Sequence, residues 1–514
     1  MNGAEAVILT LLAGGVDTCF TNPGTSEMHL VAALDRSPEM RCVLALFEGV
    51  ATGAADGYAR MAGKPACTLL HLGPGFANGM ANLHNASRAR VPMVNLIGQH
   101  PGYHLRFGAP LTSDIEAIAR PYSNWLRTCE DVAAIGSDTS EAMASAGALP
   151  GRIATLIVPA DVAWSEGGQV GKMHTDAPKR VPMPEKVERA AKMLRADRRT
   201  AILIGGNALY GAGIEAAGRV FEATGAKLFA PYPFVRLRHG AGTPPIERVN
   251  YILEQATEQF QDFEQLLLAG AAAPVSYFAY QGKQSHPTRS DCEVFTLADE
   301  TEDSCQALIS LADWFPARQA RSAVVESDRP TAPNGEVTLA GLAVAIAATL
   351  PDGAVVADES MTSGRGILAA TRGCAPHDWL ACTGGSIGIA MPLAVGAAVA
   401  CPDRPVLCLT ADGSGMYTLQ ALWTMARQGL HVVTVVFANR TYGVLKREFG
   451  NLGVGAPGPQ AKALFDIGHP DLNWVSIAQG MGVPGTRVTS LGEFASALRR
   501  GYGGEGPSLI EVPL

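Results

Sequence analysis

The feature that most constrains this chain is a segment near its C-terminus, residues 407–442, which reads LCLTADGSGMYTLQALWTMARQGLHVVTVVFANRTY. One apolar run ends in Asp-Gly-Ser, an amphipathic stretch follows, and a second apolar run ends in Asn. This order predicts a strand, a turn, a helix and a second strand parallel to the first. Because the carboxyl ends of parallel strands meet at one edge of a sheet, we expect Asp412 and Asn439 to lie side by side.

These two side chains have the chemistry of a magnesium–diphosphate site. Carboxylate and amide oxygens are ligands that Mg²⁺ accepts in proteins, and a bound phosphate supplies further oxygens. Gly413 and Ser414 add backbone N–H groups at a helix start, where an anion is stabilised. The alternative is that the Asp caps the helix and that the Asn belongs to a turn.

The alternation of strand and helix patterns extends over the whole chain, whose 514 residues are too many for one core. Two stretches rich in Gly, Pro and charge, SEGGQVGKMHTDAPKRVPMPEK and ESDRPTAPNGE, interrupt it. We therefore expect three α/β domains at 1–165, 183–322 and 336–514. Such alternation predicts doubly wound parallel sheets with helices on both faces.

Composition excludes several classes of protein. The net charge of −8 argues against a nucleic-acid partner. The sequence contains no run of 18 apolar residues, so no membrane span is expected. The apolar N-terminus has no basic leader and is interpreted as a core helix, not a signal peptide. The ten cysteines are scattered without a CxxC pair, so we expect reduced thiols in a cytoplasmic protein.

The segment ADGSGMYTLQALWTMARQGLHVVTVVFANRTYG resembles the thiamin-diphosphate signature, which begins Gly-Asp-Gly and ends Asn-Asn. The resemblance implies that Asp412 and Asn439 bind Mg²⁺ through their side chains and Thr441 through its carbonyl. Ala411 and Ala438 depart from the signature. Neither changed position is a ligand, so metal binding is expected to survive.

The segment FEGVATGAADGYAR, residues 47–60, resembles the part of the same family that carries its catalytic glutamate, here Glu48. A carboxylate hydrogen-bonded to the aminopyrimidine ring of the cofactor favours removal of the thiazolium proton, which is general base catalysis. The alternative is an ordinary glutamate at a helix start, stabilised by the helix dipole.

Two further segments resemble loops of the pyrimidine-binding part. FTNPGTSE resembles the family's Asn-Pro-Gly loop, and the resemblance directs the Thr25 hydroxyl at the substrate carboxylate. HLGPGFANGMANLHNA places His71 where benzoylformate decarboxylases carry a catalytic histidine, and Asn78 where it helps to place the pyrimidine. The alternatives are a capped β-turn and a structural histidine. His84, His100 and His104 are further candidates that the sequence does not rank.

Two segments resemble the remaining cofactor contacts. The resemblance implies that the segment GGSIGIAMPLAVGAA bends the cofactor over Ile387, and the alternative is that Ile387 is a core isoleucine. It also implies that the segment ADESMTSGRG contacts the diphosphate through Thr362. The cofactor-binding residues implied by the resemblance are Asn22, Pro23, Gly24, Glu48, Asn78, Thr362, Gly385, Ile387, Asp412, Gly413, Ser414, Asn439, Tyr442 and Gly443.

The order of these motifs is that of the family of acetolactate synthases, benzoylformate and pyruvate decarboxylases, pyruvate oxidases and oxalyl-CoA decarboxylases. In that family the glutamate of one subunit reaches the Mg²⁺–diphosphate of another. The resemblance therefore implies a homodimer or homotetramer with its active sites at the subunit interface, acting on a 2-keto acid. Flavin binding in the middle block rests on family analogy alone, since ILIGGNALYGAG lacks GxGxxG spacing. Arg236 and Arg238 either meet a phosphate there or form a solvated edge.

The residues expected around the substrate are Leu111, Leu445 and Glu448. Leu111 stands about where acetolactate synthases have Gln, which favours a reaction like that of benzoylformate decarboxylase. Ala279 replaces the second catalytic histidine of that enzyme, and Glu448 replaces an aromatic residue of its pocket. A Glu448 carboxylate at a buried pocket mouth would repel a second acidic group on the substrate and suit a polar or cationic one, unless Glu448 is a solvated helix residue.

The sequence thus predicts a thiamin-diphosphate- and Mg²⁺-dependent decarboxylase of a 2-keto acid, with ligation of the product to a second carbonyl left open. The catalytic candidates are Glu48, His71 and Thr25. The first alternative is the catalytic subunit of an acetolactate synthase. The second is a cofactor-binding homologue without turnover.

Overall fold

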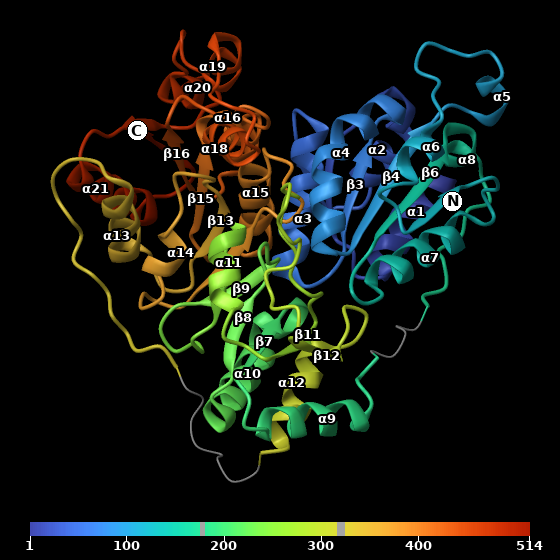
Figure 1. The fold of residues 1–514 in the computed structure, drawn as a ribbon. Coiled ribbons are helices and arrows are strands. Elements are labelled where there is room, and N and C mark those ends of the chain that lie inside the picture. The colour runs from blue at the N-terminus through green and yellow to red at the C-terminus, as the bar shows by residue number, and fades with distance from the viewer. Residues whose placement is uncertain (175–179, 316–323) are drawn as a thin grey trace.

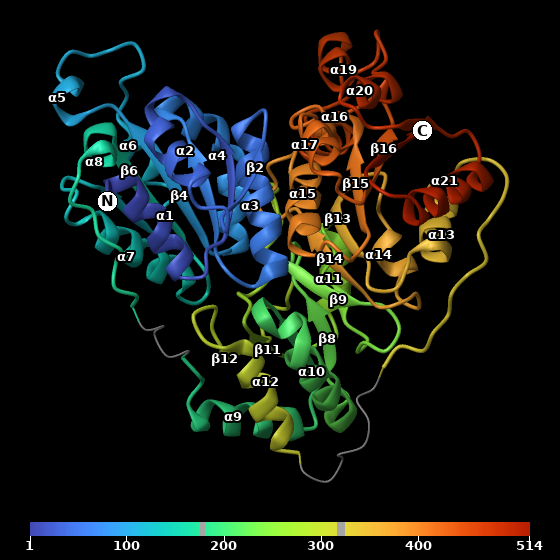
Figure 2. The same ribbon diagram turned by 180° about the vertical axis from the view of Figure 1, so that it is seen from behind.

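The computed structural model describes residues 1–174, 180–315 and 324–514, and the helices and strands of this part form three lobes, each built on its own sheet (Figure 1). The blue-to-teal and orange-to-red lobes lie side by side, and the green-to-yellow lobe lies below them (Figures 1 and 2). No helix of this part is long and apolar enough to cross a membrane.

The first sheet has the order β2-β1-β3-β4-β6-β5, and all its strand pairs are parallel. One face packs on helices α1 and α7, and the other on α3 and α4. The strands are β1 (Thr18–Asn22), β2 (Arg41–Leu44), β3 (Ala66–Leu70), β4 (Met93–Gln99), β5 (Trp125–Thr128) and β6 (Ile153–Pro159), and the helices are α1 (Gly3–Ala13), α2 (Met28–Asp35), α3 (Glu48–Ala62), α4 (Leu72–Ala89) and α7 (Ile135–Gly147).

The second sheet, of order β10-β8-β7-β11-β12, is also parallel throughout. Helices cover both its faces, so two apolar clusters flank it. Its elements are β7 (Thr200–Ile204), β8 (Lys227–Ala230), β10 (Glu247–Arg248), β11 (Gln265–Ala269), β12 (Glu293–Ala298), α9 (Pro184–Arg195), α10 (Gly211–Thr224), α11 (Leu253–Phe260) and α12 (Ser304–Asp313).

The third sheet has the order β17-β18-β16-β15-β13-β14-β9. Its strands are parallel except β9, which pairs antiparallel with β14. The elements are β9 (Arg236–His239), β13 (Val355–Glu359), β14 (His377–Ala381), β15 (Val406–Ala411), β16 (Val432–Ala438), β17 (Gly485–Arg487), β18 (Ser508–Pro513), α13 (Leu339–Thr349), α15 (Ala390–Ala400), α17 (Ala421–Gln428), α20 (Trp474–Gly480) and α21 (Leu491–Gly503). The predicted fold class, three doubly wound sheets, is confirmed, with β9 as one antiparallel edge strand.

Strand β9 comes from the middle of the chain and lies outside the sheet of its neighbours. Arg236 and Arg238, which project from it, were expected to meet a phosphate or to lie on a solvated edge. Strand β9 is indeed the edge strand of the third sheet, and the two side chains keep 18% and 32% of their exposure, but they are paired with a carboxylate. Their guanidinium groups bind the two carboxylate oxygens of buried Asp378 at 2.8 and 3.3 Å, and Arg404 binds the same carboxylate at 2.6 Å. These charges are therefore used to fasten β9 to the third sheet.

Helices α3 and α15 join the first lobe to the third, and their contact depends on glycine. A Cβ at Gly57 would collide with the backbone of Leu393, and a Cβ at Gly396 would collide with the backbone of Ala54. The two helices therefore approach each other at backbone distance. This contact holds Glu48, the first residue of α3, in a fixed place relative to the third sheet.

Gly57→Ala should destabilise the protein by roughly 1–3 kcal/mol, because its new methyl group meets backbone that cannot rotate away. Gly147→Ala is a matched control, since nothing lies within 4 Å of a Cβ at that position, the last residue of α7. Urea unfolding of the three proteins would measure the difference. Equal midpoints for the two variants would show that the α3–α15 contact tolerates a wider separation.

Candidate active site

Asp412 and Asn439 lie at the carboxyl ends of two neighbouring parallel strands, as predicted. Strands β15 and β16 pair in register up to Ala411, and the two residues follow directly. The Asp412 oxygens accept hydrogen bonds from the backbone N–H groups of Gly413 at 2.9 Å and Arg440 at 2.7 Å. The Asn439 side-chain oxygen accepts one from Thr441 at 3.1 Å. Burial raises the pKa of Asp412, and these backbone donors oppose the shift.

The donor set at this turn suits a hard cation. It offers one buried carboxylate, one amide oxygen and the backbone around Thr441. Among residues 1–174, 180–315 and 324–514, no three His, Cys, Asp or Glu side chains gather as a metal cluster. A cation held here would therefore need oxygens from a ligand as well, which a diphosphate supplies.

The residues expected on the diphosphate side are brought together around the same turn. A Cβ at Gly413 would lie 2.7 Å from the ring of Tyr442, and one at Gly443 would lie 2.9 Å from the hydroxyl of Thr362. Ser414 is buried in the short helix α16 (Asp412–Gly415). The turn after β13, the turn after β15 and the start of α18 (Gly443–Asn451) thus form one small cradle.

Backbone strain occurs at three of the loops that carry candidate residues. Leu72, Met361 and Arg440 have φ values of 50°, 49° and 54°, in the left-handed region that L-residues rarely adopt. They adjoin His71, Thr362 and Asn439, respectively. Strained residues of this kind persist where the surrounding structure holds them, and they gather at functional sites.

The segment expected to bend the cofactor is held by a carboxylate that the sequence did not single out. Glu359, at the end of β13, accepts hydrogen bonds from the backbone N–H groups of Gly388, Ile389 and Ala390 at 2.8–3.3 Å. Ile387 lies just before them and is only half-buried, whereas Ile389 is fully buried. Ile387 is therefore not the fully buried core isoleucine of the alternative interpretation, and part of its side chain stays exposed.

Glu359 gives a prediction about pH. Burial raises its pKa from 4.5 to about 7, although three N–H donors oppose the shift. Because the folded protein then keeps this proton at pH values where an unfolded glutamate loses it, the stabilising contribution is full below pH 4.5 and disappears as the pH rises to about 7. We expect the stability of the wild type relative to Glu359→Gln to fall over this range by on the order of 3 kcal/mol. Urea unfolding of both proteins at several pH values tests this, and parallel curves would contradict it.

Glu48 is buried at the start of α3 and faces the helix α4. Its Oε2 accepts a hydrogen bond from the Asn78 amide at 3.0 Å, and a Cβ at Gly75 would lie 3.0 Å from its Oε1. Glu48 and Asn78, 30 residues apart, are thus joined directly. The absence of a side chain at Gly75 leaves Oε1 unobstructed.

His71, which follows β3, is oriented by a second carboxylate that sequence reasoning missed. Its Nδ1 lies 2.8 Å from Oε2 of Glu27, which also accepts a hydrogen bond from the Gly24 N–H at 2.8 Å. Burial raises the pKa of Glu27, and the bond to His71 opposes this. The pair fixes the imidazole and leaves its Nε2 for a ligand. The signal in the sequence was the glutamate of NPGTSE, three residues after Gly24.

The structure also ranks the other histidines. The Nε2–H of His84 donates to the carbonyl of Gly384 at 3.1 Å, which is a structural contact between the first and third lobes. His100 follows β4, beside His71 at the end of β3, and its ring lies 5.6 Å from that of His104. Burial, then the charges of His104 and His71, lower the pKa of His100.

The remaining candidates lie on the surface of the single chain. Asn22 ends β1, Pro23 and Gly24 follow it, and Thr25 is exposed in the first turn after them. Leu111 and Leu445 are also exposed. Glu448, in contrast, is mostly buried, so the interpretation as a solvated helix residue is wrong. The Tyr277 hydroxyl of the middle block lies against the Cα of Gly385.

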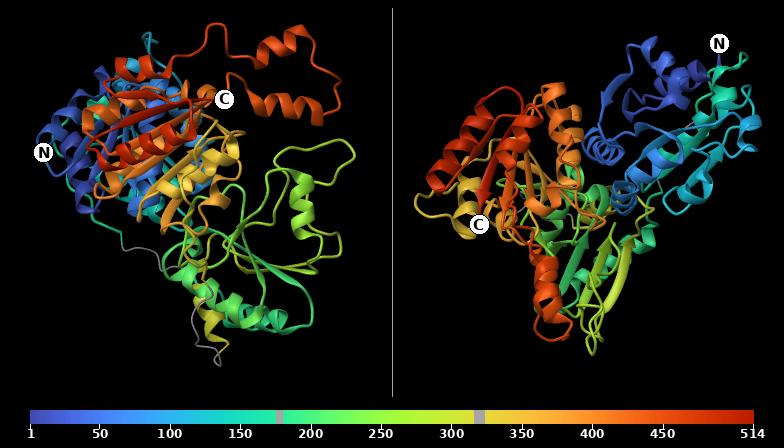
Figure 3. Two further views of the ribbon diagram at one scale, coloured as in Figure 1. Left: turned by 90° about the vertical axis from the view of Figure 1, so that its left-hand side faces the viewer. Right: turned by 90° about the horizontal axis from the view of Figure 1, so that it is seen from above.

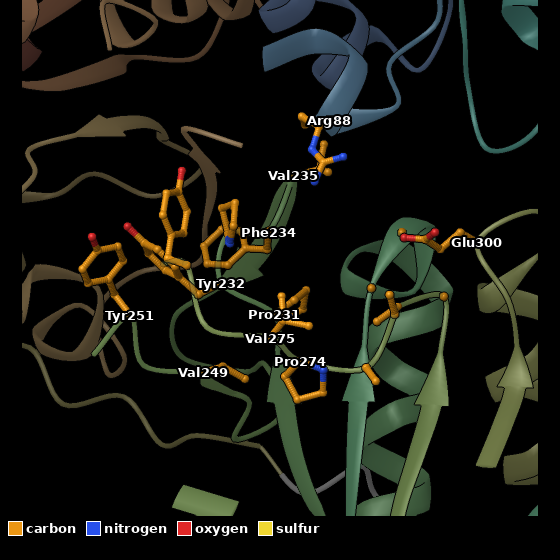
Figure 4. A pocket seen from close by; sticks show the side chains of 18 of the residues that line it. Arg88, Pro231, Tyr232, Phe234, Val235, Val249, Tyr251, Pro274, Val275 and Glu300 are labelled. Carbon is orange, nitrogen blue, oxygen red and sulfur yellow. The ribbon is translucent and has the colours of Figure 1, made fainter. Parts of the chain in front are cut away.

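One cavity, of about 280 Å³, opens between the middle lobe and the first lobe, above the carboxyl ends of β7, β8 and β11 and below Arg88 (Figure 4). Tyr232 and Tyr251 lie on one side of it and Glu300 on the other (Figure 4). None of the residues predicted for the cofactor or the substrate lines this cavity.

The chain matches two family descriptions. "Thiamine pyrophosphate enzyme, N-terminal TPP binding domain" matches residues 1–118, and "Thiamine pyrophosphate enzyme, C-terminal TPP binding domain" matches residues 367–512. These ranges hold the Glu48 group and the Asp412 group, respectively.

Whole-length relatives and solved structures agree with these matches. The chain is 50% identical to the "Putative acetolactate synthase large subunit IlvX" of Mycobacterium tuberculosis, over 100% of this chain and 99% of the relative. It is 27% identical to benzoylformate decarboxylase of Pseudomonas aeruginosa, over 97% and 96%. The structure of 4-hydroxybenzoylformate decarboxylase from Rhodococcus jostii superposes with a TM-score of 0.86 at 21% identity, covering 100% and 99%. The chain therefore belongs to the family of thiamine pyrophosphate enzymes that includes acetolactate synthases and benzoylformate decarboxylases.

Proposed function

We propose that this protein decarboxylates a 2-keto acid with thiamin diphosphate and Mg²⁺, in a reaction like that of benzoylformate decarboxylase. The observation that carries the proposal is the grouping of Glu48 with Asn78, and of His71 with Glu27 and the Gly24 backbone, beyond the carboxyl ends of β1, β2 and β3. A binding protein without turnover has no need of an oriented imidazole beside a buried carboxylate.

The cofactor would be held by the residues that the third sheet gathers. Asp412 and Asn439, with the Thr441 carbonyl, would bind Mg²⁺, and Thr362, Gly413, Ser414, Tyr442 and Gly443 would surround the diphosphate. Ile387 and Gly385 would support the rings, and Glu48 and Asn78 would meet the pyrimidine. When bound, thiamin diphosphate supplies an acidic ring carbon whose conjugate base reacts with the carbonyl of a 2-keto acid.

The protein's own groups would manage protons and orientation. Glu48 would exchange a hydrogen bond or a proton with the cofactor's pyrimidine. His71 holds its Nδ1 against Glu27, so Nε2 is the atom that would give or take a proton at the substrate. The exposed Thr25 hydroxyl would bind the substrate carboxylate, and the Asn22–Gly24 turn would line the same opening.

A second copy of the chain would complete the site. No hydrogen bond or ion pair among the described residues joins Glu48 or His71 to Asp412 or Asn439. Exposed apolar side chains lie on segments that follow the strands of both groups: Tyr103 and Phe107 in and just after α5 (Gly102–Leu105), and Leu452 and Leu464 around α18 and α19 (Pro459–Phe465). A homodimer or homotetramer would cover them. We place the protein in the cytoplasm, because its ten cysteines form no disulfide.

A second candidate function is that of an acetolactate synthase, and the relative with 50% identity is named as one. A panel of 2-keto acids, with CO₂ release and product followed together, separates the candidates. We expect an aldehyde from a keto acid other than pyruvate. Acetolactate from pyruvate would select the synthase, and bound cofactor without CO₂ from any substrate would select the non-catalytic homologue.

A further inference from the structure

The cavity between the first and middle lobes has no part in the proposed function. Its volume is about 280 Å³, and it lies where the carboxyl ends of β7, β8 and β11 face Arg88 and Arg90 at the end of α4 (Figure 4). In both views of Figure 3 the green elements of the middle lobe lie next to the other lobes. Because residues of two lobes line one space, a ligand held there would contact both lobes at once.

The cavity opens at the point of the second sheet where the strand order reverses. In the order β10-β8-β7-β11-β12, the chain proceeds to one side from β7 and to the other side from β11. Open α/β sheets bind ligands outside the carboxyl ends of the strands at such a reversal. Gly205 and Gly206 follow β7, Gly270 and Ala271 follow β11, and all four residues line the cavity. The position is therefore one at which the fold favours a ligand.

The volume of the cavity limits the size of that ligand. A dry protein cavity of about 150 Å³ is enough to hold benzene, and pockets for drug-sized molecules measure about 300–1,000 Å³. The cavity of about 280 Å³ therefore has room for one ring with a polar substituent. It is too small for a flavin dinucleotide, which carries two ring systems and a diphosphate.

Three tyrosines form an aromatic wall on one side of the cavity. The rings of Tyr232, Tyr251 and Tyr277 all contact one another, with ring centroids 5.3–6.2 Å apart. Burial raises the pKa of Tyr232 to about 12, although the charge of Arg248 opposes the shift, so this hydroxyl stays neutral. Uncharged rings attract a second aromatic ring through offset or edge-to-face contacts. The wall therefore favours an aromatic ligand.

The charge of the lining is positive by one unit. Its charged residues are Arg88, Arg90 and Glu300, and the last two form an ion pair with each other. Arg88 extends from α4 towards the cavity and has no ion pair or side-chain hydrogen bond within the described part of the chain (Figure 4). Burial raises the pKa of Tyr277, and the nearby charge of Arg88 opposes the shift. A guanidinium with free N–H groups beside an aromatic wall selects an anion, and two parallel N–H groups match a carboxylate.

Two contacts connect the cavity to the segment that is expected to bend the cofactor. The hydroxyl of Tyr277 lies against the Cα of Gly385. On the side of the first lobe, His84 of α4 holds the carbonyl of Gly384, and Arg88 lies one helical turn beyond His84. A ligand that joins Arg88 to Tyr277 would therefore fix both supports of this segment.

We propose that the cavity binds a single-ring aromatic carboxylate, with the carboxylate on Arg88 and the ring against Tyr232 and Tyr277, and that the bound acid tightens cofactor binding. The acid is an effector and not a substrate. Arg88 is 88 − 71 = 17 residues beyond His71, which is about 26 Å along α4 at 1.5 Å per residue. The site goes beyond the proposed function, because it needs no keto-acid chemistry.

Calorimetric titration of the full-length holoenzyme with benzoate and with its uncharged analogue benzamide tests the charge of the site. We expect benzoate to bind at least tenfold more tightly, and Arg88→Gln to remove this preference because the amide is polar but carries no charge. Arg499→Gln is the matched control, since it removes another exposed arginine, on α21, and should keep the preference. Equal affinities of the wild type for both probes, or an unchanged preference in Arg88→Gln, would overturn the proposal.

A third probe, cyclohexanecarboxylate, has the same charge as benzoate but a saturated ring without flat faces. It should bind at least threefold more weakly than benzoate to the wild type. Equal binding would mean that the tyrosine rings contribute nothing, and would overturn the aromatic class of the ligand. Displacement of benzoate by a lower concentration of ADP would likewise refute a single-ring acid as the occupant.

The effect on the cofactor is measured separately, by equilibrium dialysis of thiamin diphosphate with Mg²⁺. Coupling between two binding sites is reciprocal. Saturating benzoate should therefore raise the cofactor affinity of the wild type at least fivefold, the holoenzyme should bind benzoate more tightly than the apoenzyme by the same factor, and Arg88→Gln should show neither change. These measurements need no turnover, so their outcome is independent of which 2-keto acid reacts. Benzoate that binds without changing the cofactor affinity would overturn the role as an effector.

Discussion

Glu48→Gln should lower kcat by about 10²–10⁴-fold, the usual contribution of a positioned general acid or base, and leave cofactor binding nearly intact. The amide has the size and shape of the carboxylate, and its oxygen can still accept the hydrogen bond from Asn78. It cannot carry the proton that a carboxylate exchanges. Turnover of a 2-keto acid, measured beside the amount of thiamin diphosphate retained after gel filtration, separates these two effects.

The matched control for Glu48→Gln is Glu185→Gln, which removes a carboxylate from the first turn of helix α9. If Glu48 acts only on the dipole of its helix, both changes should cost less than about 1 kcal/mol of stability and leave kcat alone. Activity of Glu48→Gln within about twofold of the wild type would therefore return Glu48 to the role of an ordinary helix-start residue.

The parts of the site that follow from strand order were predictable from the sequence. A turn, a helix of ordinary length and a returning parallel strand separate Asp412 from Asn439, so the two residues are expected at the ends of neighbouring strands. The register of β15 with β16 confirms this expectation. The position of His71 at the end of β3 followed in the same way. In each case a local rule of chain geometry decides the outcome, so distant partners are not needed.

Contacts that depend on distant partners could not be predicted. Glu448 was expected either at the buried mouth of a substrate pocket or as a solvated helix residue, because nothing near it in the chain shows that Tyr251 and Tyr280 lie against it. The strand β9 was assigned to the middle block, because its bond to the third sheet depends on Asp378, 140 residues away. These contacts depend on how the lobes pack against one another, and the hydrophobic periodicity of the sequence carries no information about that packing.

Buried carboxylates that act on other residues form a second class that was missed. Glu27 orients His71 and Glu359 caps the start of α15, and in the sequence each resembles an ordinary turn residue. Their roles become visible only through burial, since a fully buried carboxylate must find several donors. Each of these carboxylates accepts a hydrogen bond from a residue or segment that the motifs did identify.

Asp412→Ala should abolish Mg²⁺-dependent retention of thiamin diphosphate, weakening it by at least about 100-fold, or roughly 2.7 kcal/mol. Asp412 is the one carboxylate in the predicted ligand set, so its removal leaves the cation with uncharged protein ligands against a diphosphate. The measurement is equilibrium dialysis of the cofactor with Mg²⁺ and with EDTA. Asp403→Ala, at the exposed loop before the other end of β15, is the control that should retain the wild-type affinity.

A loss of binding in Asp412→Ala could also arise from the turn itself, because the carboxylate accepts hydrogen bonds from Gly413 and Arg440. Asp412→Asn separates the two causes, since its amide oxygen can keep one of these bonds while the charge is lost. If the carboxylate is a metal ligand, Asp412→Asn should lose most of the Mg²⁺ dependence although its urea unfolding midpoint stays close to that of the wild type. Full, EDTA-sensitive retention in Asp412→Asn would instead mean that the negative charge at this strand end is not what holds the cation, and the ligand set would have to be drawn from other residues of the cradle.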